Sequence, residues 1–145
     1  MINISTPFSD IYTKASILFD DANLLSNLTD DEYEDLLELF LSKSKSIYFK
    51  SCKKDLSDVD DVLKEFNEIL DDEEQFILAE GIKLVWLERK LYKEENLRNK
   101  MGNRDYQIFS PANLIDKLMM LRDKTEKSLK QKVVDYSFNL FEGFN

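Results

Sequence analysis

Carboxylates are the residues most able to do chemistry in this chain, and residues 55–61, "DLSDVDD", hold four of them at close spacing. Closely spaced Asp oxygens are typical ligands of Ca²⁺. An EF-hand loop that starts at Asp55 would need glycine at its sixth position and a bidentate glutamate at its twelfth. Those two positions hold Asp60 and Phe66. The stretch is therefore interpreted as a solvated acidic loop or a short helix, and no metal site is predicted.

Other catalytic groups are scarce. The chain has no histidine, so it lacks the usual acid–base catalyst at neutral pH and the commonest metal ligand. Cys52 is the only cysteine, which excludes an intrachain disulfide and a thiolate metal cluster. Neither a glycine-rich phosphate loop nor a nucleophile elbow is present, and no spacing of carboxylates selects a hydrolytic pair. The sequence predicts a protein that is not an enzyme and uses no cofactor.

Composition restricts the fold and the partners. The chain's 145 residues suffice for one domain, predicted to span 1–145. With only 3 glycines and 2 prolines, long helices are favoured over a turn-rich β fold. A net charge of −9 argues against a high-affinity DNA-binding protein. No apolar run of about 18 residues exists and no secretory signal is visible, so no membrane partner is predicted.

Apolar residues at helical spacing predict an all-α fold, a compact bundle of about four main helices with at most one short strand pair. The first helix is expected to follow a Thr6 cap and to begin at Pro7, and the second to open with a capping box at Thr29 and Glu32. Residues 50–70 are the least clear segment, because Ser57 could also cap a helix there. The apolar face of that helix would be Val59, Val62, Leu63, Phe66 and Leu70.

The third long helix is predicted to open with a second capping box, at Asp71 and Glu74. The stretch "KEENLRNKMGN" either continues this helix or restarts one, with Gly102 as the residue that ends it. It is apolar nearly all round and is therefore expected to be central. Gly81 in its middle costs up to about 1 kcal/mol relative to alanine, which a close helix–helix approach would explain. Trp86 is interpreted either as a core anchor or as an anchor of a subunit interface.

The stretch "RDYQIFSPANLIDKLMML", residues 104–121, interrupts the helices with a short apolar patch. Ser110 is a good cap and Pro111 a good first helical residue, and proline disfavours helical geometry just before it. A short extended arm over residues 103–110 is therefore predicted before the last long helix. Phe109 could pack on Leu114. Two alternatives stay open: the arm covers the helices of its own chain, or it contacts an adjacent subunit, where it could pair as a brief strand.

The order of four segments resembles a known class of protein. "KDLS", "EEQFILAEGIKLVWLERKLY", "RDYQIFSPANLIDKL" and a terminal "DYSF" are similar to the head–tail connector (adaptor or neck) proteins of tailed bacteriophages that infect low-GC Gram-positive bacteria. The resemblance covers roughly residues 8 to 140 and contains no catalytic motif. It implies a structural virion protein at the head–tail junction, made in the cytoplasm of the host bacterium.

The resemblance also implies partners. Such adaptors form a ring, commonly twelve-fold, under the portal protein, contact other neck or tail-completion proteins, and let genomic DNA pass without sequence-specific binding. A lumen lined with carboxylates would repel the DNA backbone. Two alternatives remain: a tail-completion or baseplate component, and a small acidic helical inhibitor encoded by a phage.

A ring needs two different contact surfaces on each subunit, and the chain holds more aromatic residues than a few helices need. The C-terminal tail, residues 137–145, is expected either to pack on its own domain or to dock on a neighbouring virion protein. The candidate interface residues are Trp86, Tyr106, Ile108, Phe109, Tyr136, Phe138 and Phe141.

Overall fold

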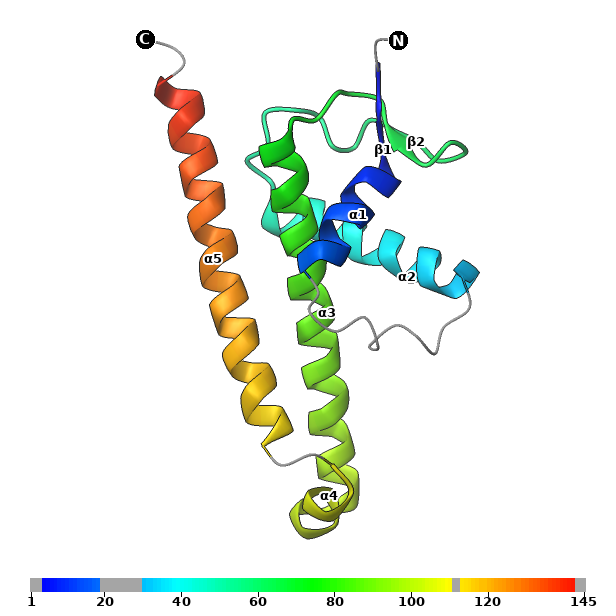
Figure 1. Cartoon of the computed structure of the whole chain (residues 1–145), viewed down its shortest axis with the longest axis vertical. Helices are drawn as coiled ribbons and strands as arrows, with labels where there is room; N and C mark the ends of the chain where they lie inside the picture. The colour runs from blue at the N-terminus through cyan, green and yellow to red at the C-terminus, as the bar shows by residue number, and fades with distance from the viewer. Residues whose placement is uncertain (1–3, 19–29, 111–112, 143–145) are drawn as a thin grey trace.

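The computed structural model describes residues 4–18, 30–110 and 113–142, without the side chains of residues 30–33, 109, 141 and 142. The fold is all-α apart from a small sheet, as predicted, and its helices surround one long central helix (Figure 1). In chain order the elements are β1 (Thr6–Pro7), α1 (Phe8–Leu18), α2 (Asp30–Lys43), the π-helical turn η2 (Ser44–Tyr48), β2 (Val59–Asp60), β3 (Glu65–Phe66), α3 (Asp72–Met101), α4 (Asn103–Phe109) and α5 (Leu114–Glu142).

Helix α3 begins and ends where the sequence predicts. The Asp71 carboxylate accepts a hydrogen bond from the Glu74 N–H at 2.8 Å, and the Glu74 carboxylate accepts one from the Asp71 N–H at 3.0 Å. The capping box is therefore confirmed. At the other end Gly102 has a φ of 85°, a backbone conformation that glycine adopts at little cost. Its N–H donates to the Arg98 carbonyl at 2.8 Å. From Glu74 to Leu87 α3 is buried almost all round, which confirms the central position of this part, whereas the residues after Leu91 are exposed or half-buried.

The glycine in the middle of α3 marks a close contact between two helices. A Cβ atom added to Gly81 would lie 1.9 Å from Ser44 Oγ and 2.8 Å from Ser44 Cβ. Ser44 is fully buried, and its hydroxyl donates to the Leu78 carbonyl at 2.9 Å. The predicted close approach is confirmed, with η2 as the element that makes it.

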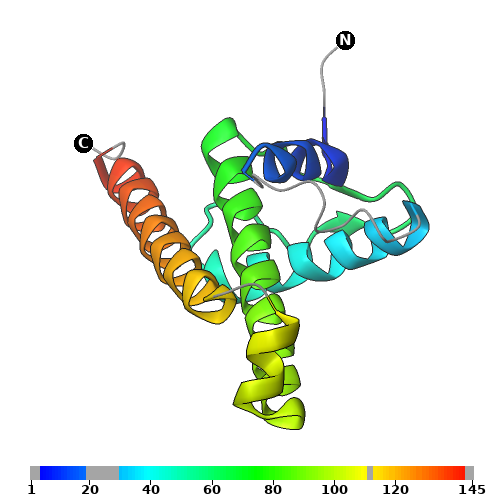
Figure 2. The ribbon, with the colours of Figure 1, turned by 60° about the horizontal axis from the view of Figure 1, so that its bottom comes forward.

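Helices α3 and α5 form a long antiparallel hairpin, with α4 at its tip (Figure 1). The α5 face toward α3 buries Ile115, Leu118, Thr125, Leu129 and Tyr136. Helices α1 and α2 pack elsewhere on α3, and α2 and the β2–β3 turn extend to the side away from α5 in both ribbon views (Figures 1 and 2). None of the described helices is both long and apolar enough to cross a membrane.

The segment before α3 is not the helix that Ser57 could have capped. It holds β2 and β3, which pair with each other and with β1 in an antiparallel sheet of order β1-β3-β2, one strand more than predicted. Hydrogen bonds from backbone N–H groups to a nearby Asp side chain compete with helix formation in this segment. The Asp60 carboxylate accepts from the N–H groups of Val62 and Leu63, each at 2.9 Å. The Thr6 hydroxyl likewise accepts from Leu70 N–H at 2.8 Å instead of capping α1, which begins at Phe8.

The extended arm predicted over residues 103–110 is wrong, because residues 103–109 form helix α4. Gly102 reverses the chain and a new helix starts at once: Tyr106 N–H donates to the Gly102 carbonyl at 3.0 Å. Only Ser110, with φ −106° and ψ 151°, has the extended geometry that a following proline favours.

The last helix also starts later than predicted, at Leu114, after Asn113 with a φ of 62°. The Asn113 carbonyl accepts from the Lys117 N–H at 2.9 Å, which is the first turn of α5. Pro111, the side chain of Phe109 and the Thr29–Glu32 capping box lie outside the described residues and side chains.

Candidate interaction surfaces

The densest polar cluster in the described residues centres on Glu74, whose side chain is 1% exposed. Its carboxylate accepts from Lys54 Nζ at 2.9 Å and from the Tyr136 hydroxyl at 2.7 Å, and Cys52 Sγ lies at 3.5 Å. Tyr136 also accepts from the Lys53 N–H at 2.9 Å. The cluster therefore ties the C-terminal part of α5 and the segment after η2 to the start of α3.

The electrostatics of this cluster suit a structural role. Burial, reinforced by the nearby Glu74 charge, raises the pKa of Cys52 to about 11. Burial and the hydrogen bond to Glu74 also raise the pKa of Tyr136. Both groups stay protonated at neutral pH, so neither supplies a nucleophile. Among the described residues, no group of three or more Cys, Asp and Glu side chains could hold a metal ion.

Cys52 should therefore react slowly with alkylating reagents. At pH 8 we expect iodoacetamide to modify it about a hundredfold more slowly in the folded chain than in urea, because the thiolate is the reactive form. Mass spectrometry of timed samples measures both rates. Equal rates would contradict the burial of this thiol.

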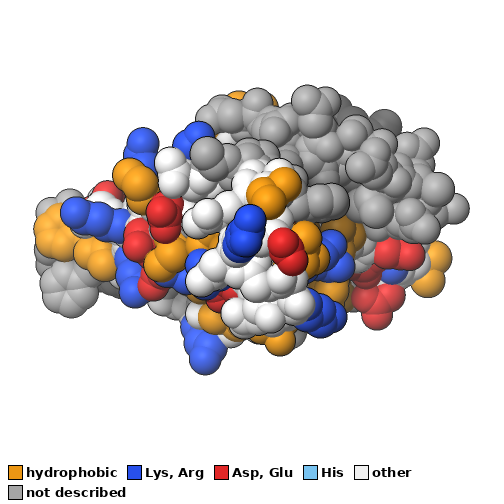
Figure 3. Space-filling view, turned by 90° about the horizontal axis from the view of Figure 1, so that it is seen from below, with side chains coloured by type: hydrophobic (Ala, Val, Ile, Leu, Met, Phe, Trp, Pro, Cys, Tyr) orange, Lys and Arg blue, Asp and Glu red, His pale blue; other side chains and the backbone are white. Residues whose placement is uncertain are grey.

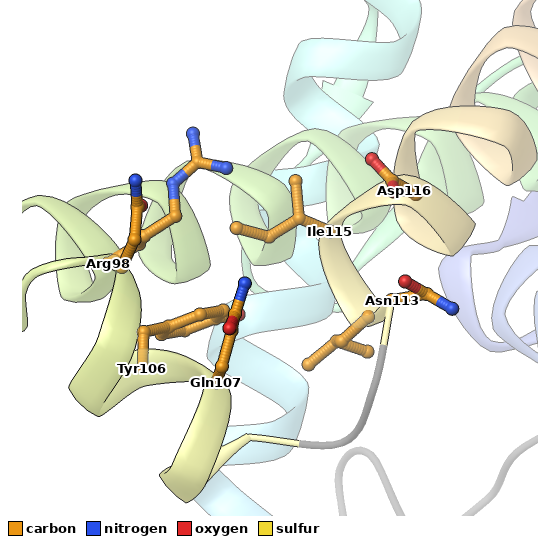
Figure 4. A pocket seen from close by; sticks show the side chains of 8 residues that line it. Arg98, Tyr106, Gln107, Asn113, Ile115 and Asp116 are labelled. Atoms are coloured by element: carbon orange, nitrogen blue, oxygen red, sulfur yellow. The ribbon is translucent and has the colours of Figure 1, made fainter.

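A pocket of about 450 Å³ lies at the hairpin tip, between α4 and the start of α5 (Figure 4). Tyr106 forms part of its wall and is held there by a hydrogen bond from its hydroxyl to Glu94 Oε2 at 2.8 Å. The charged lining consists of Arg98 and Asp116, among amides and two aliphatic residues. One cation, one anion and several amides select no particular class of ligand, so this pocket carries no functional assignment.

Ile108 lies on α4 with 78% of its surface exposed. The substitution Ile108→Asp should therefore change the free energy of unfolding by less than about 0.5 kcal/mol, as for other surface positions. Urea unfolding followed by circular dichroism measures this. If the stability holds but assembly fails, the tip is an interface; a loss of several kcal/mol would place Ile108 in a core.

One side of the molecule carries a surface that we call the acidic edge. It combines the outer face of α2 with the β2–β3 turn, which are joined by an ion pair between Lys64 Nζ and Glu38 Oε1 at 3.0 Å. Acidic and apolar side chains alternate on it. Its acidic members are Glu34, Asp35, Glu38, Asp58, Asp60 and Asp61, and its exposed apolar members are Leu39, Val62 and Leu63.

The opposite side carries a surface that we call the basic edge, formed by the outer face of α5, where Lys124, Lys127 and Lys130 alternate with Asp123 and Glu126. Most of the chain's 20 basic residues lie after residue 75, whereas most of its 29 acidic residues lie before it. Lys124 and Lys127 make no ion pair with any described residue, whereas Lys130 pairs with Glu126 at 2.8 Å. The exposed apolar members are Met120, Val134 and Phe138. In Figure 3 basic, acidic and hydrophobic side chains mix at the left, the side of α5, and acidic side chains gather at the right, the side of α2.

An apolar groove of about 310 Å³ opens on the basic edge, where α5 meets α3 and η2. Leu84 and Leu129 are buried lining residues, and Val134 is 59% exposed. Tyr48 closes one side, with its hydroxyl hydrogen-bonded to Glu88. The remaining lining residues are Val133, Glu126 and Lys130.

The candidate interface residues divide into three groups. Trp86, Tyr106 and Tyr136 are buried in the chain's own core, at 8%, 6% and 3% exposure, which favours the core interpretation of each. Ile108 and Phe138 are exposed, on the hairpin tip and on the basic edge. Both Phe109 and Phe141 lie in helices, but their side chains are outside the description. Residues 137–142 of the predicted tail continue α5.

Sequence reasoning did not identify Val62 and Leu63 as surface residues, because it named them only as part of the apolar face of a possible helix. Their neighbours give the one local signal: two adjacent aliphatic residues stand between Asp61 and Lys64 in a stretch of turn-forming acids. Comparisons of the chain with protein-family models, curated proteins and solved structures found no match.

Proposed function

We propose that this chain is a structural protein of a tailed-phage virion, a head–tail connector. Its copies form a ring between the portal protein and the tail, through which the genome passes. The segments that resemble adaptor proteins support the proposal. The observation that carries it is the presence of two unlike edges, one acidic and one basic, on opposite sides of α3 (Figures 1 and 2).

A ring is closed by head-to-tail contacts, so each subunit must present two different surfaces that fit each other. The acidic and basic edges meet this requirement, because they differ in charge and both expose aliphatic or aromatic side chains. A two-fold dimer would instead place a surface against its own copy. On the acidic edge that arrangement would bring like charges together, which costs free energy.

The other partners follow from the same role. A ring at the head–tail junction contacts the portal on one side and further neck or tail-completion proteins on the other. Its contact with DNA is transient, because a net charge of −9 gives little attraction for phosphate.

Native mass spectrometry of the purified chain, alone and mixed with the portal protein of the phage that encodes it, tests the proposal. We expect a closed oligomer of more than two copies in at least one of the two samples. An oligomer that binds tail or baseplate proteins but never the portal would favour the tail alternative. A monomer or dimer that binds a host enzyme instead would contradict the connector role and favour an inhibitor.

A further inference from the structure

We propose that the acidic edge of one copy docks on the basic edge of the next, with Val62 and Leu63 inserted into the apolar groove beside α5. This inference rests on the proposed ring and names the surfaces that close it. Its occupant is a second copy of the same chain.

The β2–β3 turn presents its aliphatic residues outward on a fixed frame. Val62 is 89% exposed and Leu63 65% exposed. The Asp60 carboxylate holds both of their N–H groups at 2.9 Å, and the Lys64 carbonyl accepts from the Phe8 N–H at 2.9 Å. A turn held at both ends loses little conformational entropy on binding, so burial of its apolar surface contributes to affinity.

The groove on the basic edge matches this turn in size and polarity. Its volume of about 310 Å³ equals roughly ten water molecules at about 30 Å³ each, which is room for two branched aliphatic side chains. Leu84 and Leu129 form apolar parts of its lining. Water in such a groove finds few hydrogen-bond partners and is readily displaced by an apolar group.

Charge fixes the pairing of the two surfaces. Asp58, Asp60 and Asp61 lie on the turn near the aliphatic pair, which Lys64 follows directly. At the groove, Lys127 and Lys130 lie beside Val134 together with Asp123 and Glu126. Lys130 is paired with Glu126, so Lys127, which makes no ion pair with any described residue, is the groove's cation available to the turn's carboxylates. Complementary charges of this kind accelerate association and exclude the reversed pairings, in which lysines would face lysines.

The arrangement also explains why the turn of one copy does not occupy the groove of the same copy. The turn and α5 lie on opposite sides of α3 in both ribbon views (Figures 1 and 2). A turn therefore reaches only another copy's groove, and each copy keeps one free turn and one free groove until the ring closes.

Two single variants and their mixture test the contact. Val62→Asp damages the turn and Val134→Asp damages the groove; both positions are exposed, so circular dichroism should give unchanged melting temperatures. Each variant alone should need at least about a thirtyfold higher concentration to associate, as for a hot-spot substitution. Ile17→Asp, at an exposed position on α1 (68% exposed), is the matched control and should assemble like the unmodified chain.

The mixture gives the sharper result. Val134→Asp retains an intact turn and Val62→Asp an intact groove, so an equimolar mixture should form heterodimers with one good contact and stop there. Mass photometry with one variant carrying a mass tag identifies them. A mixture without heterodimers overturns the inference.

Charge reversal provides an independent test of the contact. Asp61→Lys and Lys127→Glu should each weaken association, and the two changes in one chain should restore it. Association of the unmodified chain should also weaken as salt rises from about 0.05 M to about 0.5 M, because the screening length falls from about 14 Å to about 4 Å. A double variant as weak as the single ones overturns the pairing.

The outcomes separate this inference from the connector role. If the unmodified chain forms rings and Val62→Asp forms them equally well, the docking inference fails and the connector proposal stands. If Val62→Asp loses only its binding to another virion protein, the second copy is the wrong occupant. If the unmodified chain stays monomeric both alone and with the portal, both proposals fail.

Discussion

The substitution Gly81→Ala should destabilise the folded chain by about 1–3 kcal/mol, the range for overpacking a close-packed interior. The new methyl group would lie 2.8 Å from Ser44 Cβ, so rotation of the Ser44 hydroxyl alone cannot make room. At an exposed helical position the same change would be stabilising by up to about 1 kcal/mol. The sign of the effect therefore decides whether the contact between α3 and η2 exists.

Urea denaturation of the two chains measures the change. The matched background is Ser44→Gly, which removes the atoms that the methyl group would meet. In that background Gly81→Ala should cost clearly less or become favourable, and the difference is the coupling energy of the two positions. A stabilising Gly81→Ala in the unmodified chain would contradict the packing described for α3.

Glu74→Ala should destabilise the chain by about 3 kcal/mol, the lower part of the range for breaking a buried ion pair. The loss leaves the Tyr136 hydroxyl, the Asp71 N–H and the Lys54 ammonium without the acceptor that they share. Lys54 is partly exposed and recovers some hydration, which keeps the loss from being larger. Glu73→Ala, at the exposed neighbouring position, should change stability by less than about 0.5 kcal/mol.

The same carboxylate should make stability depend on pH. Burial alone would raise the pKa of Glu74, but hydrogen bonds from Tyr136, the Asp71 N–H and Lys54 outweigh it and lower the pKa below its ordinary value of 4.5. A lowered pKa means that the contribution is complete above that value and is lost as the pH falls through the folded-state pKa. Glu74→Gln should therefore flatten the stability curve on the acid side, whereas Glu73→Gln should not.

The local features of the fold were predictable because their causes lie within a few residues. The capping box at Asp71 and Glu74, the glycine end at residue 102 and the wide apolar surface of α3 each depend on one helix alone. Gly81 likewise predicted a close approach of another helix to α3. Its partner, Ser44, lies 37 positions earlier in the chain, and no local pattern identifies it.

One prediction failed, and one open alternative was excluded, where weak local signals met stronger ones. Proline at position 111 affects the residue before it, and Ser110 is indeed extended, but the whole arm was inferred from that single constraint. The hydrogen bond between Tyr106 and Glu94 favours a helical α4 packed on α3. Likewise, the helical spacing of Val62 and Leu63 is overridden by Asp60, which binds their backbone and turns the chain.

The candidate interaction surfaces could be predicted only in part. A sequence shows that acidic residues gather early and basic residues late, but not that α2 and α5 lie on opposite sides of α3. The apolar groove is assembled from η2, the middle of α3 and the second half of α5, and no stretch of sequence contains it. Exposed Phe138 was found because it is aromatic; Val134 and Met120 carried no such signal.

Cryo-electron microscopy of the assembly formed by the purified chain on its portal protein tests the connector proposal most directly. The expected map shows a closed ring in which α5 of each subunit faces α2 and the β2–β3 turn of the next, with density for Val62 and Leu63 beside Val134. A map with two-fold dimers, or with this chain absent from the portal, would contradict the proposed role.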